Sequence, residues 1–338
     1  MKPKVAIVIL NWNGKHFLEQ FLPLLRERTP EPWSRIYVAD NGSTDGSVEW
    51  LTQNFPDIER IVFQSNLGYT GGYNRALKQI DATYYILLNS DVEVTSGWLT
   101  PLAELMDDMP ECGVCMPKIL SRAQPDTFEY AGACGGYLDW LGFPFCRGRI
   151  LTSIEKDNGQ YDQSVTVFWA SGTCMVVRSQ LFHRLGGLDD LFFAHMEEID
   201  FCWRALWAGY TVRVVPQSKV LHVGGGTLPN DSPHKLYLNY RNNLLMMYKN
   251  LGKPEIVPVL LLRILADHLS AVAYFFQGKW NFTLSVYKAH LHFWRMHRLT
   301  SRPTGKKPDL RSVMYRGSIV WRFFLSGKKL TFQKLRML

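Results

Sequence analysis

The most constraining feature of the sequence is an uncharged run near its start. Residues 4–10 (KVAIVIL) are rich in β-branched side chains and carry no charge after Lys4. Such a run is typical of a strand buried on both faces, as the strands of a parallel sheet are. Two more apolar runs of strand length follow at residues 35–39 and 84–88. The first part of the chain is therefore expected to be built around a mostly parallel sheet.

Stretches suited to helices separate these strands. They cover residues 17–28, 47–55 and 72–80, and a short strand is expected at 61–63. This alternation is the pattern of βαβ units. We therefore predict an α/β fold with a Rossmann-like, mostly parallel sheet flanked by helices.

Each of the first four expected strands ends in a polar segment. In such sheets ligands bind at the edge where the carboxyl ends of the strands meet. One segment of this kind would be an ordinary turn, because Asn, Asp, Gly and Ser are the usual turn residues. Four in succession favour a polar ligand such as a nucleotide. The residues expected to bind it are Asn11, Asn13, Asp40, Ser43, Asn66, Gly68, Asn89, Ser90 and Asp91.

Two of these strand ends suggest how a phosphate group is held. Gly68, Gly71 and Gly72 precede a helix, so its first backbone N–H groups are expected to face an anion. Asp91 at a strand end and His222 in VLHVGGGT are candidate ligands of a divalent cation, Mg²⁺ or Mn²⁺. Singly, Asp91 would suit a turn and His222 a structural role; their joint occurrence favours the metal site.

An acidic run stands in apolar surroundings at AHMEEIDFCW, residues 194–203. Glu197, Glu198 and Asp200 fall at the start of an expected helix, where the helix dipole favours negative charge. That accounts for their position but not for the apolar residues before them. A carboxylate in partly apolar surroundings has a raised pKa, which suits a general base.

A further segment, residues 168–179 (FWASGTCMVVRS), suits a strand in which Gly172 permits the close approach of a ligand or another backbone. We expect Trp169, Gly172 and Asp200 to contact a second substrate, the acceptor of a transferred group. The aromatic residues between 130 and 145 form either an acceptor-binding wall or irregular core, because aromatic faces stack on sugar rings.

Together these motifs resemble the inverting glycosyltransferases of family 2, which have the GT-A fold, and are most similar to the rhamnosyltransferase-type subgroup. The likeness covers about residues 3–245. It implies that Asp40 contacts the nucleotide base and that Asn66, Gly68 and Asn74 line the donor site. It also implies that Asp91 binds the metal and the diphosphate. His222 would be the second metal ligand, and the acidic run would contain the base.

Two residues depart from the family pattern. Asn89 replaces the first Asp of the family's D-x-D motif, which leaves the need for a cation open. Glu198 stands where the family has an Asp base, so Glu197 and Glu198 compete for that role, and Glu198 is preferred.

The resemblance implies transfer of a sugar, with dTDP-rhamnose as preferred donor, to a glycan or lipid-linked acceptor in cell-surface polysaccharide synthesis. UDP-hexoses and UDP-N-acetylhexosamines stay open as donors. Other interpretations are a nucleotidyltransferase that makes an activated sugar, and a non-catalytic glycan- or membrane-binding protein of the same fold. The first lacks a basic, glycine-rich triphosphate loop near the N-terminus.

Charge is divided unevenly along the chain. Fourteen basic residues and one acid lie from Lys279 onward, so this part carries +13 of a net charge of +8 and the rest carries −5. Residues 255–276 are strongly apolar, but Arg263, Asp267 and His268 leave uncharged runs shorter than a spanning helix needs. We predict a catalytic domain over 1–245 and a basic, amphipathic helical region over 246–338 that lies on a membrane surface.

This surface would place the protein peripherally at the cytoplasmic face of the inner or plasma membrane. An extra core helix or a homo-oligomer contact is the alternative, and nucleic acid is not expected because no base-reading module accompanies the charge. The start MKPKVAIVIL lacks the pattern of a signal peptide, so reduced thiols are expected. Cys112 and Cys115 have C-x-x-C spacing, but no second pair follows, which favours burial over zinc binding.

Overall fold

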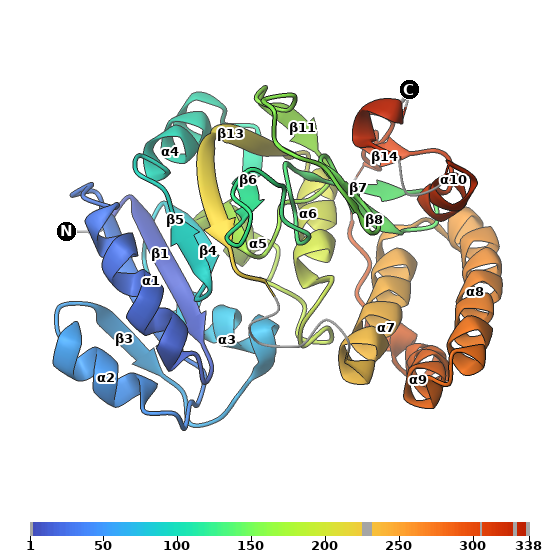
Figure 1. Cartoon of the computed structure of the whole chain (residues 1–338), viewed down its shortest axis with the longest axis horizontal. Coiled ribbons are helices and arrows are strands. Elements are labelled where there is room, and N and C mark those ends of the chain that lie inside the picture. The colour runs from blue at the N-terminus through green and yellow to red at the C-terminus, as the bar shows by residue number, and fades with distance from the viewer. Residues whose placement is uncertain (1–2, 225–231, 305, 327–329, 336–338) are drawn as a thin grey trace.

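The computed structural model describes residues 3–224, 232–304, 306–326 and 330–335. Within them a large nine-stranded sheet is flanked by helices, and a smaller sheet and a group of helices lie to one side (Figure 1). The α/β class is confirmed. The large sheet contains β1 (Val5–Asn11), β2 (Ser34–Asp40), β3 (Glu59–Val62), β4 (Tyr84–Asn89), β5 (Val92–Val94), β6 (Cys112–Ser121), β11 (Val165–Val167), β12 (Cys174–Arg178) and β13 (Thr211–His222).

Parallel pairing joins the four N-terminal strands that the sequence predicts, in the order β4-β1-β2-β3. The central strand β1 is buried on both faces, as its β-branched run requires. The helices beside the sheet are α1 (Lys15–Glu27), α2 (Ser47–Asn54), α3 (Gly68–Leu77), α4 (Leu99–Asp108), α5 (Ser179–Arg184) and α6 (Glu197–Trp207). The polar strand ends therefore meet at one edge, the lower one in Figure 1.

The expected strand over residues 168–179 is wrong in its first half. Regular pairing begins only at Cys174, where β12 runs antiparallel to β4 and β6. Before it, Trp169 forms a bridge with Gly136 of the smaller sheet, and Ser171 turns the chain by accepting the N–H of Cys174. The apolar segment is thus divided between two sheets.

The smaller sheet joins the end of the chain to its middle. It contains β7 (Gly136–Asp139), β8 (Pro144–Cys146), β9 (Arg149–Ile150), β10 (Ser153–Ile154) and β14 (Met314–Tyr315). β14 pairs in parallel with β7, and the buried carboxylate of Asp139 accepts the N–H of Ile319. Residues 314–319 of the C-terminal part therefore pack against β7 in the middle of the chain.

The C-terminal helices are α7 (Pro233–Asn250), α8 (Lys253–Phe276), α9 (Trp280–Met296) and α10 (Ile319–Ser326). The boundary expected after residue 245 falls inside α7, and the division into two domains stays a prediction. All six cysteines are buried and free of disulfides, as expected for Cys112 and Cys115.

Candidate functional site

The carboxyl ends of β1 and β2 build the first part of the site. Asn11 is fully buried and donates its amide to Asp40 (3.0 Å) and to Ser43 Oγ (3.2 Å). Asp40 also accepts the N–H of Ser43, and Asn13 donates its own N–H to Ser43 Oγ. The buried Oδ1 of Asn11 has no partner. These four expected donor-site residues therefore form one polar cluster.

A neighbouring residue, Asn41, was not singled out from the sequence. Its amide donates to Asn66 Oδ1 and to the carbonyl of Gly68, both at 3.0 Å, and its Oδ1 accepts the N–H of Leu67. Asn41 thus fixes the loop that carries two expected donor-site residues. Its place directly after Asp40 at a strand end is the only sequence signal that points to it.

The start of α3 differs from the expectation. The N–H groups of Tyr69 and Thr70 donate to the carbonyl of Phe193, at 2.8 and 3.2 Å, so they do not face a free anion site. Gly68 has φ +74°, and an added Cβ would lie 2.5 Å from the ring of Phe193. Glycine is required here both by its φ angle and by this contact. The loop before α6 therefore packs against the start of α3, at the edge of the sheet where the strands end.

The expected metal ligands lie together. β13 pairs with β5 so that His222 stands opposite Val92, next to Asp91. The Nε2 of His222 is 3.2 Å from Asp91 Oδ1, and its Nδ1 is 3.3 Å from Glu129 Oε2. Burial alone would lower the pKa of His222, but Asp91 and Glu129 outweigh it and raise the pKa to about 10. No sequence pattern points to Glu129, which lies 93 residues from His222.

This pair fits a divalent cation that keeps open positions for a substrate. The 3.2 Å between His222 Nε2 and Asp91 Oδ1 is an ion-pair distance for the protonated ring, and a divalent cation bound by both atoms would replace the Nε2 proton. Glu129 would accept the remaining ring proton, as carboxylates behind metal-bound histidines do. No group of three or more His, Cys, Asp or Glu side chains arranged for a metal occurs in the described part of the chain. Further ligands would have to come from the diphosphate and from water.

Asn89 and Ser90, which precede Asp91 in the chain, lie next to the Asp91–His222 pair. The backbone of Asn89 donates to the carbonyl of Thr173 at 3.0 Å, and Ser90 is half-buried next to Gly14. Both lie at the carboxyl end of β4, as expected.

The acidic run begins α6, and two of its carboxylates each have one oxygen without a partner. Glu197 is buried and Glu198 half-buried, and the Oε2 atom of each has no hydrogen bond. Burial raises the pKa of Glu198 to about 7, and burial together with the neighbouring Glu198 raises that of Glu197 as well. Gly172 borders Glu198, since an added Cβ would lie 3.8 Å from Glu198 Cβ. Glu198 is therefore the more accessible of the two carboxylates, and it lies beside Gly172.

Asp200 and Trp169, the expected acceptor contacts, are buried and hydrogen-bonded within the protein, and their contact with an acceptor stays a prediction. Asp200 is fully buried and accepts Arg204 at 2.7 Å, Lys249 at 2.9 Å and the amide of Asn250 at 2.9 Å. Burial opposes its ionisation, but the two cations prevail and lower its pKa. Trp169 is buried and donates to the carbonyl of Tyr137. Both side chains are already satisfied inside the protein.

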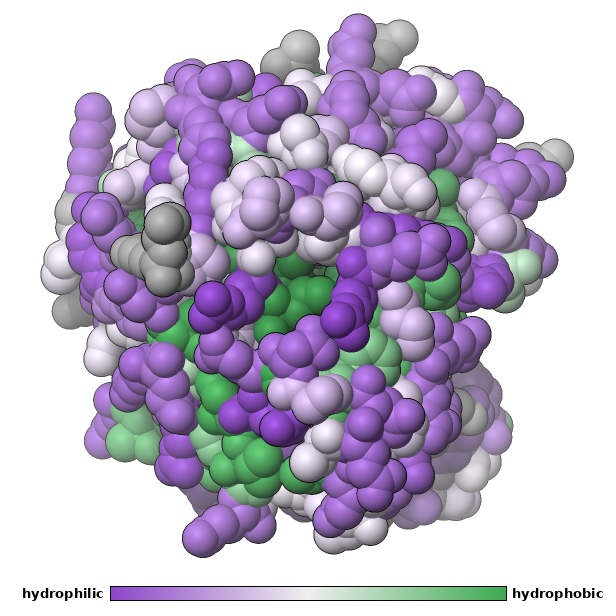
Figure 2. All heavy atoms as spheres, turned by 90° about the vertical axis from the view of Figure 1, so that its left-hand side faces the viewer, coloured by the Kyte–Doolittle hydropathy of each residue, from purple (hydrophilic) through white to green (hydrophobic). Residues whose placement is uncertain are grey.

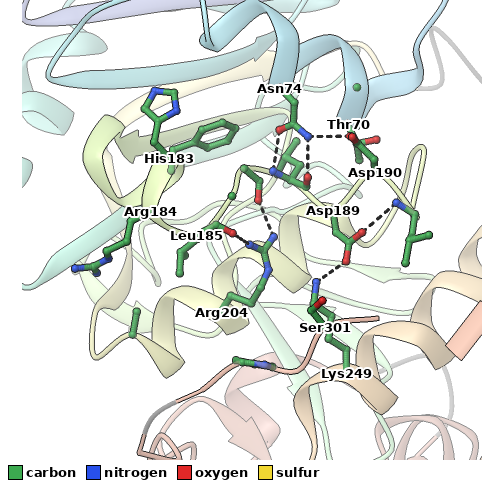
Figure 3. Close-up of a pocket in the computed structure, with 18 of the residues that line it drawn as sticks. Thr70, Asn74, His183, Arg184, Leu185, Asp189, Asp190, Arg204, Lys249 and Ser301 are labelled. Atoms are coloured by element: carbon green, nitrogen blue, oxygen red, sulfur yellow. Dashed lines mark hydrogen bonds and ion pairs between the residues drawn. The ribbon is translucent and has the colours of Figure 1, made fainter. Parts of the chain in front are cut away.

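Asn74 also has a different role from the expected donor contact. Its amide donates to the carbonyl of Leu188 and to Asp190, and its Oδ1 accepts the N–H of Leu188 (Figure 3). It lines an open groove of about 1100 Å³ behind the loop that leads to α6. Asn74 therefore holds this loop, and the groove is also lined by Leu67, Thr70 and Gly71 of the loop and helix that follow β3.

Comparison with known proteins agrees with this geometry. The family model for glycosyl transferase family 2 matches residues 6–186. An N-acetylglucosaminyl-diphospho-decaprenol L-rhamnosyltransferase of Mycobacterium tuberculosis is 28% identical over 73% of this chain and 85% of its own. A low-salt glycan biosynthesis hexosyltransferase of Haloferax volcanii is 23% identical over 72% of this chain and 76% of its own.

Solved structures share the fold. GalNAc-T7 with UDP, GalNAc and Mn²⁺ superposes with a TM-score of 0.59 at 15% identity, over 89% of this chain and 55% of that longer one. A mannosyltransferase of Pyrobaculum calidifontis with GDP-Man and Mn²⁺ gives 0.51 at 13% identity, over 90% and 77%. The fold is GT-A, and the family match covers more than half of the chain. The chain belongs to glycosyl transferase family 2 and is a glycosyltransferase.

Proposed function

We propose that the protein is an inverting rhamnosyltransferase that uses dTDP-rhamnose and a lipid-linked acceptor in cell-surface polysaccharide synthesis. The observation that carries the reaction type is the Glu198 carboxylate, which has a partnerless oxygen and lies beside Gly172. The sugar and the acceptor rest on the likeness to the mycobacterial rhamnosyltransferase. Inverting transfer needs one base and no covalent enzyme intermediate.

Glu198 performs the proton transfer in this proposal. The acceptor oxygen forms a bond to the anomeric carbon while the bond from that carbon to the diphosphate oxygen breaks, and the hydroxyl proton passes to Glu198. Burial raises the pKa of both glutamates, and the proximity of Glu198 also raises that of Glu197. The pair therefore tends to carry a single charge, which avoids two adjacent buried charges.

The leaving diphosphate gains negative charge as the sugar departs. A cation held by Asp91 and His222 would neutralise this charge. The polar cluster around Asn11 and Asp40 would hold the nucleoside, and the Oδ1 of Asn11 is a free acceptor there. Glu129 would keep the Nε2 of His222 turned toward Asp91.

Glu198→Gln should lower kcat by about a hundredfold or more while dTDP still binds, because the amide cannot accept the acceptor proton. In the wild type, kcat should fall as the pH drops through about 7, since protonation of Glu198 removes the base. Steady-state kinetics against pH, with dTDP titrated by calorimetry, measures both effects. Glu197→Gln is the matched control and should retain most activity; the reverse order of the two variants would assign the base to Glu197.

His222→Ala should weaken Mn²⁺ binding to the dTDP complex at least about tenfold, in line with the loss of a metal ligand or its support. Calorimetric titration of Mn²⁺ into protein with dTDP measures this without turnover. The control is His16→Ala, which changes a histidine outside the site. Equal Mn²⁺ affinity in the wild type and in His222→Ala would remove the metal role.

The donor can be identified by ligand-induced stabilisation. dTDP-rhamnose should raise the unfolding temperature more than UDP-glucose, UDP-galactose or UDP-N-acetylglucosamine at equal concentration, because stabilisation follows occupancy of the folded state. Differential scanning fluorimetry with Mn²⁺ tests the panel. A larger shift with a UDP-sugar would favour a UDP-hexose or N-acetylhexosamine transferase, consistent with the hexosyltransferase relative. Release of pyrophosphate from a nucleoside triphosphate would instead identify a nucleotidyltransferase.

We also propose that α8 and α9 bind the membrane that holds the acceptor. Exposed apolar side chains recur along α8 at intervals of four residues and along α9 at three or four. They are Val257, Leu261, Leu265 and Leu269 of α8 and Leu284, Tyr287, Leu291 and Trp294 of α9. Exposed Lys288, Arg295 and Arg298 accompany them, which suits anionic headgroups. The face on the side of α1 and α2 is instead largely hydrophilic (Figure 2).

The inner face of α8 is occupied by the protein. By length and composition, residues Pro254–Phe276 could cross a membrane, and a third of their most apolar window is buried. Arg263 donates to the carbonyl of Leu141 and pairs with Asp267, and His290 of α9 contacts the same carboxylate. These buried contacts favour a helix that lies along the membrane surface over one that spans it.

Leu261→Glu should lower binding to phosphatidylglycerol vesicles about tenfold or more, because burying one leucine side chain contributes about 1.5–3 kcal/mol. Val62→Glu on β3 is the control, since Val62 is exposed to a similar extent (55% against 64%) on another face. Vesicle co-sedimentation measures binding. Equal loss of vesicle binding in both variants would contradict the membrane surface. If the mass of the wild type rises with protein concentration and only Leu261→Glu abolishes that rise, the surface is a homo-oligomer contact.

A further inference from the structure

The backbone just before the acidic run is unusual. Phe193, His195 and Met196 have φ angles of +64°, +70° and +72°, and none of them is glycine. Positive φ is unfavourable for residues with a Cβ and persists only where surrounding contacts enforce it. These residues lead directly into Glu197 and Glu198. The position of the base therefore depends on whatever holds this turn.

A single amide on α7 holds most of the turn. The Nδ2 of Asn242 lies 2.9, 2.8 and 2.7 Å from the carbonyl oxygens of Phe192, Ala194 and His195. Asn242 is fully buried, and its own Oδ1 accepts the Nε of Arg241 at 2.8 Å. Arg241 in turn donates to the carbonyls of Leu191 and Phe192. Because the turn directs these carbonyl oxygens toward α7, the N–H groups of one side-chain amide can be shared among them.

The C-terminal end of α7 fixes α6, the helix that follows the turn. Lys249 and Asn250 bind the Asp200 carboxylate, which lies in the first turn of α6. The turn and the start of α6 are thus fastened to one helix at two points. The Phe193 carbonyl then joins them to α3 through the N–H groups of Tyr69 and Thr70.

We propose that Asn242 is a positioning residue for the reaction, which holds the 192–196 turn in the conformation that presents Glu198 to the acceptor. It acts through the turn and does not touch the substrates. Its role rests on the proposed function only in taking Glu198 as the base. The sequence offers no local sign of this role, because Asn242 is 44 residues from Glu198.

Asn242→Leu tests this proposal in the full-length protein, since leucine is similar in size but donates no hydrogen bond. We expect kcat per folded molecule to fall about 10- to 100-fold, the effect of misplacing a catalytic group by roughly 1 Å. The KM for the nucleotide-sugar should change less than kcat, because the turn reaches the donor site only through the start of α3, and the cluster around Asn11 and Asp40 does not contact Asn242. Asn242→Ser, a smaller polar replacement, carries the same measurements if the leucine variant does not fold.

The pH profile separates positioning from stability alone. Burial is what raises the pKa of Glu198 to about 7, so a loosened turn that admits water should move the acid limb of kcat to lower pH. The titratable groups that sense Glu198 are Glu197, Tyr69 and Cys202, and neither substitution changes them. A role limited to stability would lower the unfolding temperature and leave this limb in place.

Asp267→Asn is the matched control, because it weakens a buried contact of α8 without touching the turn. It should lower the unfolding temperature while kcat per folded molecule and the acid limb stay unchanged. Amide hydrogen exchange of residues 192–197 should speed up in Asn242→Leu and not in Asp267→Asn. Unchanged exchange, or an unchanged kcat and acid limb, would overturn the proposal. Amide exchange reports on the conformation of the turn even if Glu198→Gln shows that another residue is the base. The positioning proposal and the proposed function can therefore fail separately.

Discussion

The pairing of the end of β13 with β5 is the interaction on which the site depends. The register of β13 against β6 shifts between Val215 and Lys219, and only then does the strand run antiparallel to β5. His222 thereby reaches Asp91, although 131 residues separate them in sequence. Backbone hydrogen bonds fix this approach, since Val223 donates to the carbonyl of Asp91 at 3.1 Å. Two ligands on separate loops would not be held together in this way.

A second set of backbone contacts joins the donor edge to the base. The Phe193 carbonyl occupies the first N–H groups of α3, which a phosphate would otherwise use. A diphosphate bound as proposed would then lie on the Asp91 and His222 side of the edge. The same carbonyl belongs to the turn that Asn242 holds, so the donor loop, the base and α7 form one connected unit. Because α9 packs on α7, the proposed membrane surface lies only one helix away from this unit.

The first four strands and their polar ends could be predicted from the sequence because both are local patterns: a buried strand followed by turn residues. The pairing of Asp91 with His222 could be inferred because strand ends share one edge. Glu129, Asn41 and Asn242 could not, since their partners are set by tertiary contacts. The internal partners of Asn74, Asp200 and Trp169 could not be predicted either. A motif gives the residue type at a position, but not whether another part of the chain already satisfies its polar atoms.

The three acids of the run show how one helix turn divides such roles. Asp200 receives two cations and an amide, which keep it ionised and structural. Glu197 and Glu198 receive neither, so burial keeps them from ionising together. Environments that push pKa values apart in this manner are what assign acid and base roles in an active site. The Asp200 carboxylate anchors α6 to α7, while one oxygen of Glu198 in the same helix turn is left without a partner.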